Sequence, residues 1–185
     1  MKKSLFLVGT LLVAGMWSAP AQAADHYVSG FGGVSWINEG DTDAGMTGTA
    51  AIGCDYGDTR LEAEFGYQHG STTVLLPPAP AWKYAKDIYS LMANGYYDVD
   101  LGGVDLYGTV GLGVAQVDTG TYPHRIPPSN IVDDDNVSLA YQLGVGLAVP
   151  VGSGVSVDAK YRYFSTLDNN QLSSHSALLG LRVGL

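Results

Sequence analysis

The clearest pattern in the chain is an alternation of apolar residues with small or polar ones in its last third. The apolar members of the first run are Leu139, Tyr141, Leu143, Val145, Leu147 and Val149. A period of two is typical of a β-strand. Residues 150–154 contain Pro150 and Gly154 and predict a turn. The alternation then resumes, with Asp158, Lys160 and Arg162 opposite the apolar side, so these strands carry charge on one face.

The length of these runs decides which face meets which solvent. They span ten to twelve residues, whereas strands of soluble proteins usually have about 5–6. Tilted strands of this length cross a bilayer. The apolar face then meets lipid and the charged face lines a barrel interior. We predict lipid-facing side chains at Leu143, Val145, Val157 and Leu181, and interior ones at Gln142, Asp158 and Arg182.

The remaining strands follow from the same pattern. We predict eight, near residues 27–37, 46–56, 60–68, 87–97, 105–117, 138–149, 155–166 and 176–185, although 87–97 also suits a helical stripe. The connections alternate between short ones at 56–59, 98–104 and 150–154 and long ones at 38–45, 69–86, 118–137 and 167–174. Short turns belong in the periplasm and long loops outside. The predicted fold is therefore all-β, an eight-stranded antiparallel up-and-down transmembrane β-barrel.

The start of the chain predicts an export signal. Lys2 and Lys3 precede an apolar run from Leu5 to Trp17, and residues 21–23 read Ala-Gln-Ala, a typical cleavage site. We expect residues 1–23 to be a cleaved signal peptide and residues 24–185 to be one outer-membrane barrel domain of a Gram-negative bacterium.

Composition excludes some functions. The formal charge is −9, and loss of Lys2 and Lys3 with the signal peptide would bring it to −11, which disfavours nucleic-acid binding. Cys54 is the only cysteine, so no intramolecular disulfide can form, and we interpret it as a small apolar filler. We expect no cofactor.

Seven charged residues fall on predicted interior positions, four of them basic and three acidic: Arg60, Glu62, Glu64, Asp158, Lys160, Arg162 and Arg182. Eight strands enclose a space only just wide enough for side chains. One interpretation is mutual pairing that fills the barrel, because isolated buried charges are costly. The other is a polar lumen that opens and closes.

Three further groups of residues are candidates for a functional site. His175 and Ser176 are adjacent, so on a strand they face opposite ways and cannot pair as base and nucleophile; we expect no enzyme. Residues 133–135, three aspartates, lack the spacing of a calcium loop, and we expect no metal. The stretch 75–84 is apolar and proline-rich. One interpretation is an external contact loop through Leu75, Leu76, Trp82 and Tyr84; the others are insertion into neighbouring lipopolysaccharide and packing over the barrel mouth.

Several segments resemble a family of small outer-membrane barrels that includes the OmpA transmembrane domain, the opacity proteins and the surface-antigen porins. They are YVSGFGGVS at 27–35, RLEAEFGYQ at 60–68, LMANGYYDV at 91–99, AYQLGVGLA at 140–148 and DAKYRYF at 158–164. The resemblance implies an adhesin, a structural anchor or a narrow pore. The family usually ends in an aromatic residue read by the barrel-assembly machinery, whereas this chain ends in Leu185. In OmpA a peptidoglycan-binding domain follows the barrel; this sequence stops with the barrel, so we do not expect anchoring to the cell wall.

Together these observations predict a non-catalytic outer-membrane surface protein with a structural or adhesive role. The alternatives are a narrow porin-like diffusion channel and a lipid A-modifying enzyme. Expected partners are outer-membrane lipid and lipopolysaccharide, the barrel-assembly machinery during insertion, and an external or host ligand bound by the loops. We expect a monomer.

Overall fold

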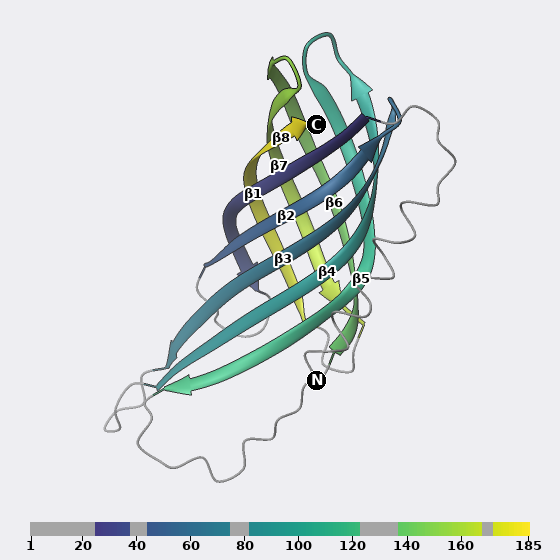
Figure 1. The fold of residues 1–185 in the computed structure, drawn as a ribbon. Coiled ribbons are helices and arrows are strands. Elements are labelled where there is room, and N and C mark those ends of the chain that lie inside the picture. The colour runs from purple at the N-terminus through teal and green to yellow at the C-terminus, as the bar shows by residue number, and fades with distance from the viewer. Residues whose placement is uncertain (1–24, 38–43, 75–81, 123–136, 168–171) are drawn as a thin grey trace.

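Eight antiparallel strands close into a barrel in which each strand pairs with its neighbours in the sequence and β1 pairs with β8 (Figure 1). The structure, a computed structural model, describes residues 25–37, 44–74, 82–122, 137–167 and 172–185. The strands are β1 Asp25–Ile37, β2 Gly45–Asp55, β3 Thr59–Val74, β4 Trp82–Asp100, β5 Asp105–Tyr122, β6 Val137–Gly152, β7 Val155–Thr166 and β8 Ser173–Gly184. The predicted fold class is confirmed. The predicted signal peptide, residues 1–23, lies outside the described ranges.

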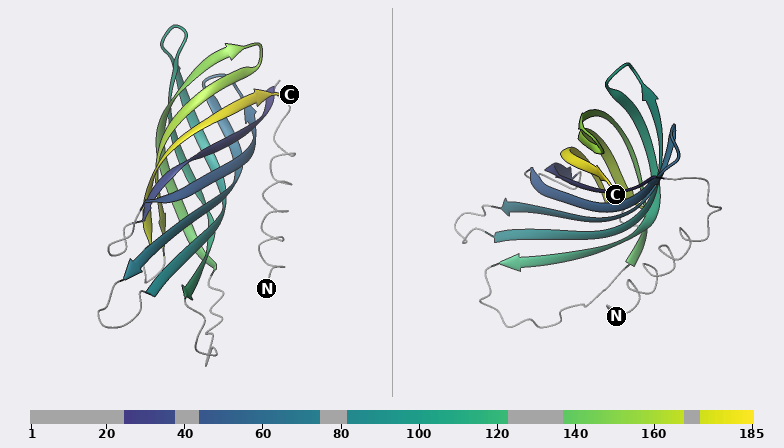
Figure 2. Two further views of the ribbon diagram at one scale, coloured as in Figure 1. Left: turned by 90° about the vertical axis from the view of Figure 1, so that its left-hand side faces the viewer. Right: turned by 45° about the horizontal axis from the view of Figure 1, so that its top comes forward.

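Three strands, β3, β4 and β5, extend furthest beyond their predicted bounds. The expected loop 69–86 is wrong in extent, because β3 continues to Val74 and β4 begins at Trp82, which are register partners. β5 likewise continues to Tyr122. The reason is local preference: β-branched residues near Val74 and aromatic residues after Trp82 favour strands. β3, β4 and β5 therefore extend furthest, at the end of the barrel away from the C-terminus (Figure 2).

The turn predicted at residues 150–154 is shorter than expected. β6 runs to Gly152 and β7 starts at Val155, with a register shift between Pro150 and Gly152. Proline has no backbone N–H to donate, so an irregularity at Pro150 lets the ladder continue past it. Gly154 in this turn and Gly57 in the β2–β3 turn have φ of 77° and 95°, a conformation that residues with a Cβ rarely adopt.

The two faces of the barrel wall have opposite chemistry. Outward positions are apolar and exposed, including Val28, Ile52, Leu61, Phe65, Leu106, Val110, Leu112, Leu139, Leu143, Val145, Val157 and Leu181. Inward positions are buried and largely polar, including Ser29, Thr47, Glu62, Glu64, Asn94, Gln142, Asp158 and Arg162. This is the reverse of a soluble protein and matches a wall between lipid and a polar interior. Within the described ranges, no helix is long and apolar enough to cross a membrane.

Candidate functional site

The interior next to the short turns is built around Arg60. Its Nε and one terminal nitrogen each donate to a different oxygen of Asp98, both at 2.7 Å. Its guanidinium also lies 4.4 Å from the ring centroid of Tyr96 and 5.1 Å from that of Tyr107. A bidentate pair that also contacts aromatic faces has a fixed position. Arg60 is only 2% exposed, so it closes this level of the barrel.

Asp98 is the partner that sequence reasoning missed. The predicted fourth strand ended at residue 97, which put Asp98 into a turn. In the structure β4 continues to Asp100, and the Asp98 side chain is 13% exposed. Asp98 lies two residues after the inward-facing Tyr96, and this spacing could have indicated that Asp98 faces inward as well.

The other carboxylates at this level have different surroundings. Glu62 accepts hydrogen bonds from the Tyr96 hydroxyl at 2.6 Å and from the Ser29 hydroxyl at 3.2 Å. Asp158 is 1% exposed, and its Oδ1 has no hydrogen-bond partner among the described residues. Arg182 is half-buried on β8, with its guanidinium 5.7 Å from the Tyr27 ring centroid. Of the predicted charges at this level, Glu62 is therefore held by a tyrosine and a serine, and Arg60 by Asp98.

The middle of the interior is built around Glu64. Its carboxylate accepts from Lys160 Nζ at 3.3 Å, from a terminal nitrogen of Arg162 at 3.4 Å and from Gln142 Nε2 at 3.1 Å. The second terminal nitrogen of Arg162 donates to the Thr47 hydroxyl at 3.1 Å. These contacts join β2, β3, β6 and β7 across the barrel. One carboxylate thus serves two cations in a fully buried network.

Towards the long-loop end, the interior contains apolar as well as polar side chains. The apolar ones form a buried cluster, which we call the outer apolar cluster: Ile37, Ile88, Met92, Ala115, Ala140, Phe164 and Leu172. Buried beside it, the Ser174 hydroxyl donates to Gln68 Oε1 at 2.8 Å. The alternation pattern predicted charged interior positions and did not reveal this apolar cluster. Phe164 lies on the same face of β7 as Lys160 and Arg162, and this spacing could have indicated that Phe164 faces inward. The Glu64 network is therefore followed, on its outer side, by a level that is buried and partly apolar.

On the outer surface, rings gather near the long-loop end. Tyr67 and Tyr89 lie 5.2 Å apart between centroids, and Tyr141 and Tyr163 lie 6.1 Å apart. Such rings settle where membrane meets water. Beyond the first pair, His69 Nδ1 lies 2.7 Å from Asp87 Oδ1. Although partial burial raises it, the hydrogen bonds from His69 and Tyr67 hold the pKa of Asp87 below its usual range.

The His69–Asp87 pair exposes a gap in the sequence-based argument against catalysis. The expectation of no enzyme rested on His175 and Ser176, but His69 and Ser71 are also a histidine and a serine, two residues apart on β3. The register pairs His69 with Asp87 and Ser71 with Ala85. The backbone register therefore places residue 71 two positions along β3 from the His69–Asp87 pair.

The predicted contact loop and the three aspartates are only partly described by the structure. Leu75, Leu76 and the aspartates at 133–135 lie outside the described residues. Trp82 and Tyr84, predicted as loop residues, belong to β4. Among the residues that the structure describes, no group of three or more His, Cys, Asp or Glu is arranged to hold a metal ion.

A closed antiparallel barrel with an apolar exterior and a charged interior defines a transmembrane barrel of the bacterial outer membrane. The family model described as outer membrane protein beta-barrel domain matches residues 9–183, and the chain belongs to that family. No curated protein matches the chain by sequence.

Solved structures share the fold at low identity. Neisserial surface protein A is 19% identical with a TM-score of 0.66, covering 89% of this chain and 100% of that one. Ail, the attachment invasion locus protein of Yersinia pestis, in complex with the heparin analogue sucrose octasulfate, is 14% identical with a TM-score of 0.55, at the same coverages. OprH from P. aeruginosa is 16% identical with a TM-score of 0.53, covering 88% and 100%. These likenesses concern the fold alone.

Proposed function

We propose that this protein is a non-conducting structural barrel whose interactions with other molecules take place at its external end. The observation that carries the proposal is the filled interior. Arg60, Glu64 and Phe164, which lie at three successive levels, are 2%, 1% and 0% exposed. A continuous water path would leave such inward side chains accessible to solvent, so the filled interior favours the structural role over the diffusion channel.

The charge of the external loops indicates what kind of ligand they would accept. The long connections as the sequence predicted them, 38–45, 69–86, 118–137 and 167–174, contain eight acidic and three basic residues. The solved Ail structure carries a heparin analogue, which is polyanionic. Acidic loops repel such a ligand and attract a cationic one. An external contact through these loops would therefore be with a basic surface.

Binding in nanodiscs tests this external role. Nanodiscs that carry the protein should bind a basic probe, oligolysine, with an affinity that falls as salt is added, because exposed charges are screened. They should not bind sucrose octasulfate. Empty nanodiscs of the same lipid are the control. Retention of octasulfate, or equal oligolysine binding by empty discs, would contradict the proposal.

A second candidate function is hydrolysis of a lipid ester in the outer leaflet, favoured by the neighbouring positions of Ser71, His69 and Asp87. In this reaction the serine hydroxyl attacks the ester carbonyl while His69 takes its proton and Asp87 stabilises the imidazolium. The ester C–O bond then breaks, His69 returns the proton to the leaving lipid alcohol, and the acyl group stays on the serine. Water then releases the fatty acid and frees the serine. The lowered pKa of Asp87 favours the anion that this role requires.

Lipid A mass spectrometry separates the two functions. Under the structural proposal, cells expressing the protein and cells expressing Ser71→Ala have identical lipid A. Loss of an acyl chain with the wild-type protein, but not with Ser71→Ala, would establish the hydrolase and overturn the non-catalytic proposal.

A further inference from the structure

Several buried polar atoms have no hydrogen-bond partner among the described residues, and three of them belong to one row across the barrel wall. They are Nε of Arg162 and the hydroxyl oxygens of Ser35 and Ser176. All three residues are 1% exposed or less. Buried polar groups in native proteins almost always have a partner. The hydrogen bonds of the Glu64 network leave these three atoms without one.

The strand register places the three residues side by side. Arg162 on β7 is the partner of Ser176 on β8, and Ser176 is the partner of Ser35 on β1. Neighbouring strands lie about 4.8 Å apart, so the row is about 10 Å long. Each of the three residues is buried on the inward face of its strand. The unpaired groups therefore belong to one region of the interior.

Arg162 extends past both serines. One of its terminal nitrogens donates to the Thr47 hydroxyl on β2, and the other donates to Glu64 on β3. The shorter way around the wall from β7 to β2 passes β8 and β1. The middle of the side chain, which carries Nε, therefore lies on the side of the interior where Ser176 and Ser35 are.

The chemistry of these groups suits a ligand that accepts hydrogen bonds. The Nε of arginine can only donate, and a serine hydroxyl rotates to donate its proton where an acceptor is available. Serine is also a short side chain, so two serines side by side take up little of the interior. A small acceptor that can be approached from several directions matches this set of donors.

The charge at this level favours an anion over a neutral acceptor. Lys160 and Arg162 share a single carboxylate, that of Glu64. The remaining inward acidic residues belong to the level of Arg60, nearer the short turns: Glu62, Asp98 and Asp158. Two buried cations with one buried carboxylate leave a positive charge without local compensation, which is costly away from water.

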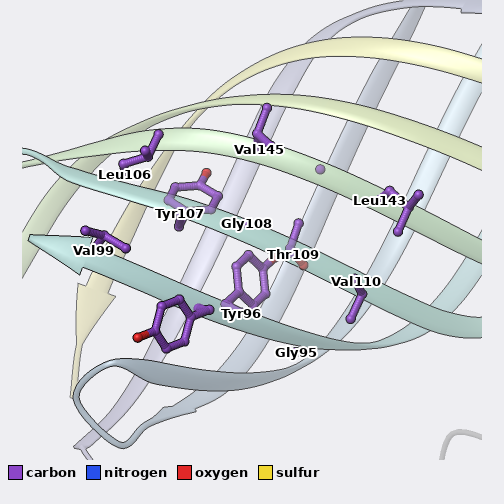
Figure 3. Close-up of a pocket in the computed structure, with 12 residues that line it drawn as sticks. Gly95, Tyr96, Val99, Leu106, Tyr107, Gly108, Thr109, Val110, Leu143 and Val145 are labelled. Atoms are coloured by element: carbon purple, nitrogen blue, oxygen red, sulfur yellow. The ribbon is translucent and has the colours of Figure 1, made fainter.

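The outer wall has a different chemistry from this row. A hollow of about 640 Å³ over β4, β5 and β6 is lined by apolar side chains such as Leu106, Val110 and Val145 (Figure 3). Hydrocarbon is the solvent of that wall, and it excludes ions. A charged ligand at this depth therefore belongs inside the barrel.

We propose that Arg162, Ser35 and Ser176 form a binding site for one chloride ion in the closed interior. Arg162 Nε and the two hydroxyls donate to the ion, and its charge compensates the second cation of this level. The ion enters before the barrel closes, and it is retained between the Arg60 level and the outer apolar cluster. The site goes beyond the external role proposed above, and loss of the ion would leave that role intact.

Thermal stability in two salts tests the site. The protein is refolded in detergent with sodium chloride or with sodium gluconate at the same ionic strength, and unfolding is followed by the change in gel migration. The midpoint should be about 5 °C higher in chloride, because an ion that binds only the folded barrel stabilises it. Gluconate is too large to replace a single chloride ion. The double variant Ser35→Ala/Ser176→Ala should lose the difference between the salts.

The matched control is Ser174→Ala, on the same face of β8 as Ser176, because the Ser174 hydroxyl donates to Gln68 Oε1 instead. This variant should keep the difference between the salts. A second measurement needs no variant: in crystals of protein refolded with sodium bromide, an anomalous bromide peak should lie beside Arg162 Nε. Equal midpoints of the wild type in both salts, a difference that the double variant retains, or a water molecule in place of the bromide peak would overturn the proposal.

Discussion

At the scale of single residues, the interior depends on charges that share partners. Glu64 accepts from both Lys160 and Arg162, and all three are almost fully buried. Breaking such a network by removing one member leaves an opposite charge without compensation in a place that water does not reach. The stability of the barrel should therefore respond to these residues more than to any exposed charge.

Arg162→Ala should lower the free energy of unfolding by about 3–5 kcal/mol, because it leaves the Glu64 carboxylate less compensated and Thr47 without a donor. Urea unfolding in detergent micelles, followed by intrinsic fluorescence, measures the change. Asp58→Ala, in the exposed β2–β3 turn, is the control and should change the free energy by about 0.5 kcal/mol or less. Equal shifts for the two variants would contradict the buried network.

Two glycines of neighbouring strands should respond in opposite ways to the same substitution. A Cβ at Gly146, on the inward face of β6, would clash with the Tyr107 ring and lie 2.6 Å from Ala159 O. Gly146→Ala should therefore destabilise the barrel by about 1–3 kcal/mol. Gly108→Ala points into open space and should stabilise it by about 0.4–1 kcal/mol, through the unfolded chain. The same unfolding assay decides, and a more stable Gly146→Ala would show that the interior has spare room.

Alternation alone predicted interior places for residues such as Glu64 and Arg162, where the structure puts them. It could not predict which partners they contact, because the closing of the barrel brings together Thr47 and Arg162, which lie 115 positions apart in the sequence. Asp98 was missed because of a strand boundary. The cluster that contains Phe164 and Met92 was not predicted. Both residues are apolar but face inward, whereas inward positions were identified from small or polar residues.

At the scale of elements, the wall consists of strands whose two faces meet different solvents. The existence and order of the eight strands could be predicted, since a period of two continues through each of them. The ends of the strands could not be predicted from the alternation, because Val74 and Trp82 still pair beyond the residues where the alternation stops. Above the membrane both faces of a strand meet water, so hydrophobic contrast no longer marks the strand.

The facing of these strands can be measured with single cysteines in a Cys54→Ser background. A fluorophore at Leu143, Val145, Val157 or Leu181, which are 41–57% exposed, should be quenched by lipid-soluble nitroxides. Labels aimed at Gln142 or Asp158, which are buried inside, should react slowly and escape this quenching. The reverse pattern would mean that the inner and outer faces had been exchanged.

At the scale of the whole molecule, closure of the sheet leaves no free edge between β1 and β8, which pair over eleven positions. A closed barrel resists detergent until heated. The mature protein should therefore show a sheet-rich circular-dichroism spectrum in detergent and migrate differently on gels before and after boiling. Identical migration under both conditions, or a helical spectrum, would contradict the closed barrel.

The closed interior is the central feature of this barrel, and conductance across a planar lipid bilayer tests it most directly. Purified protein, shown to be folded by its heat-modifiable migration, is added to the membrane, and a general porin in the same lipid verifies that channels are detected. Because Arg60, the Glu64 network and the outer apolar cluster block three successive levels, the protein should produce no discrete current steps. Reproducible steps of one size, with an ion selectivity that Arg162→Ala alters, would contradict the account and establish a channel.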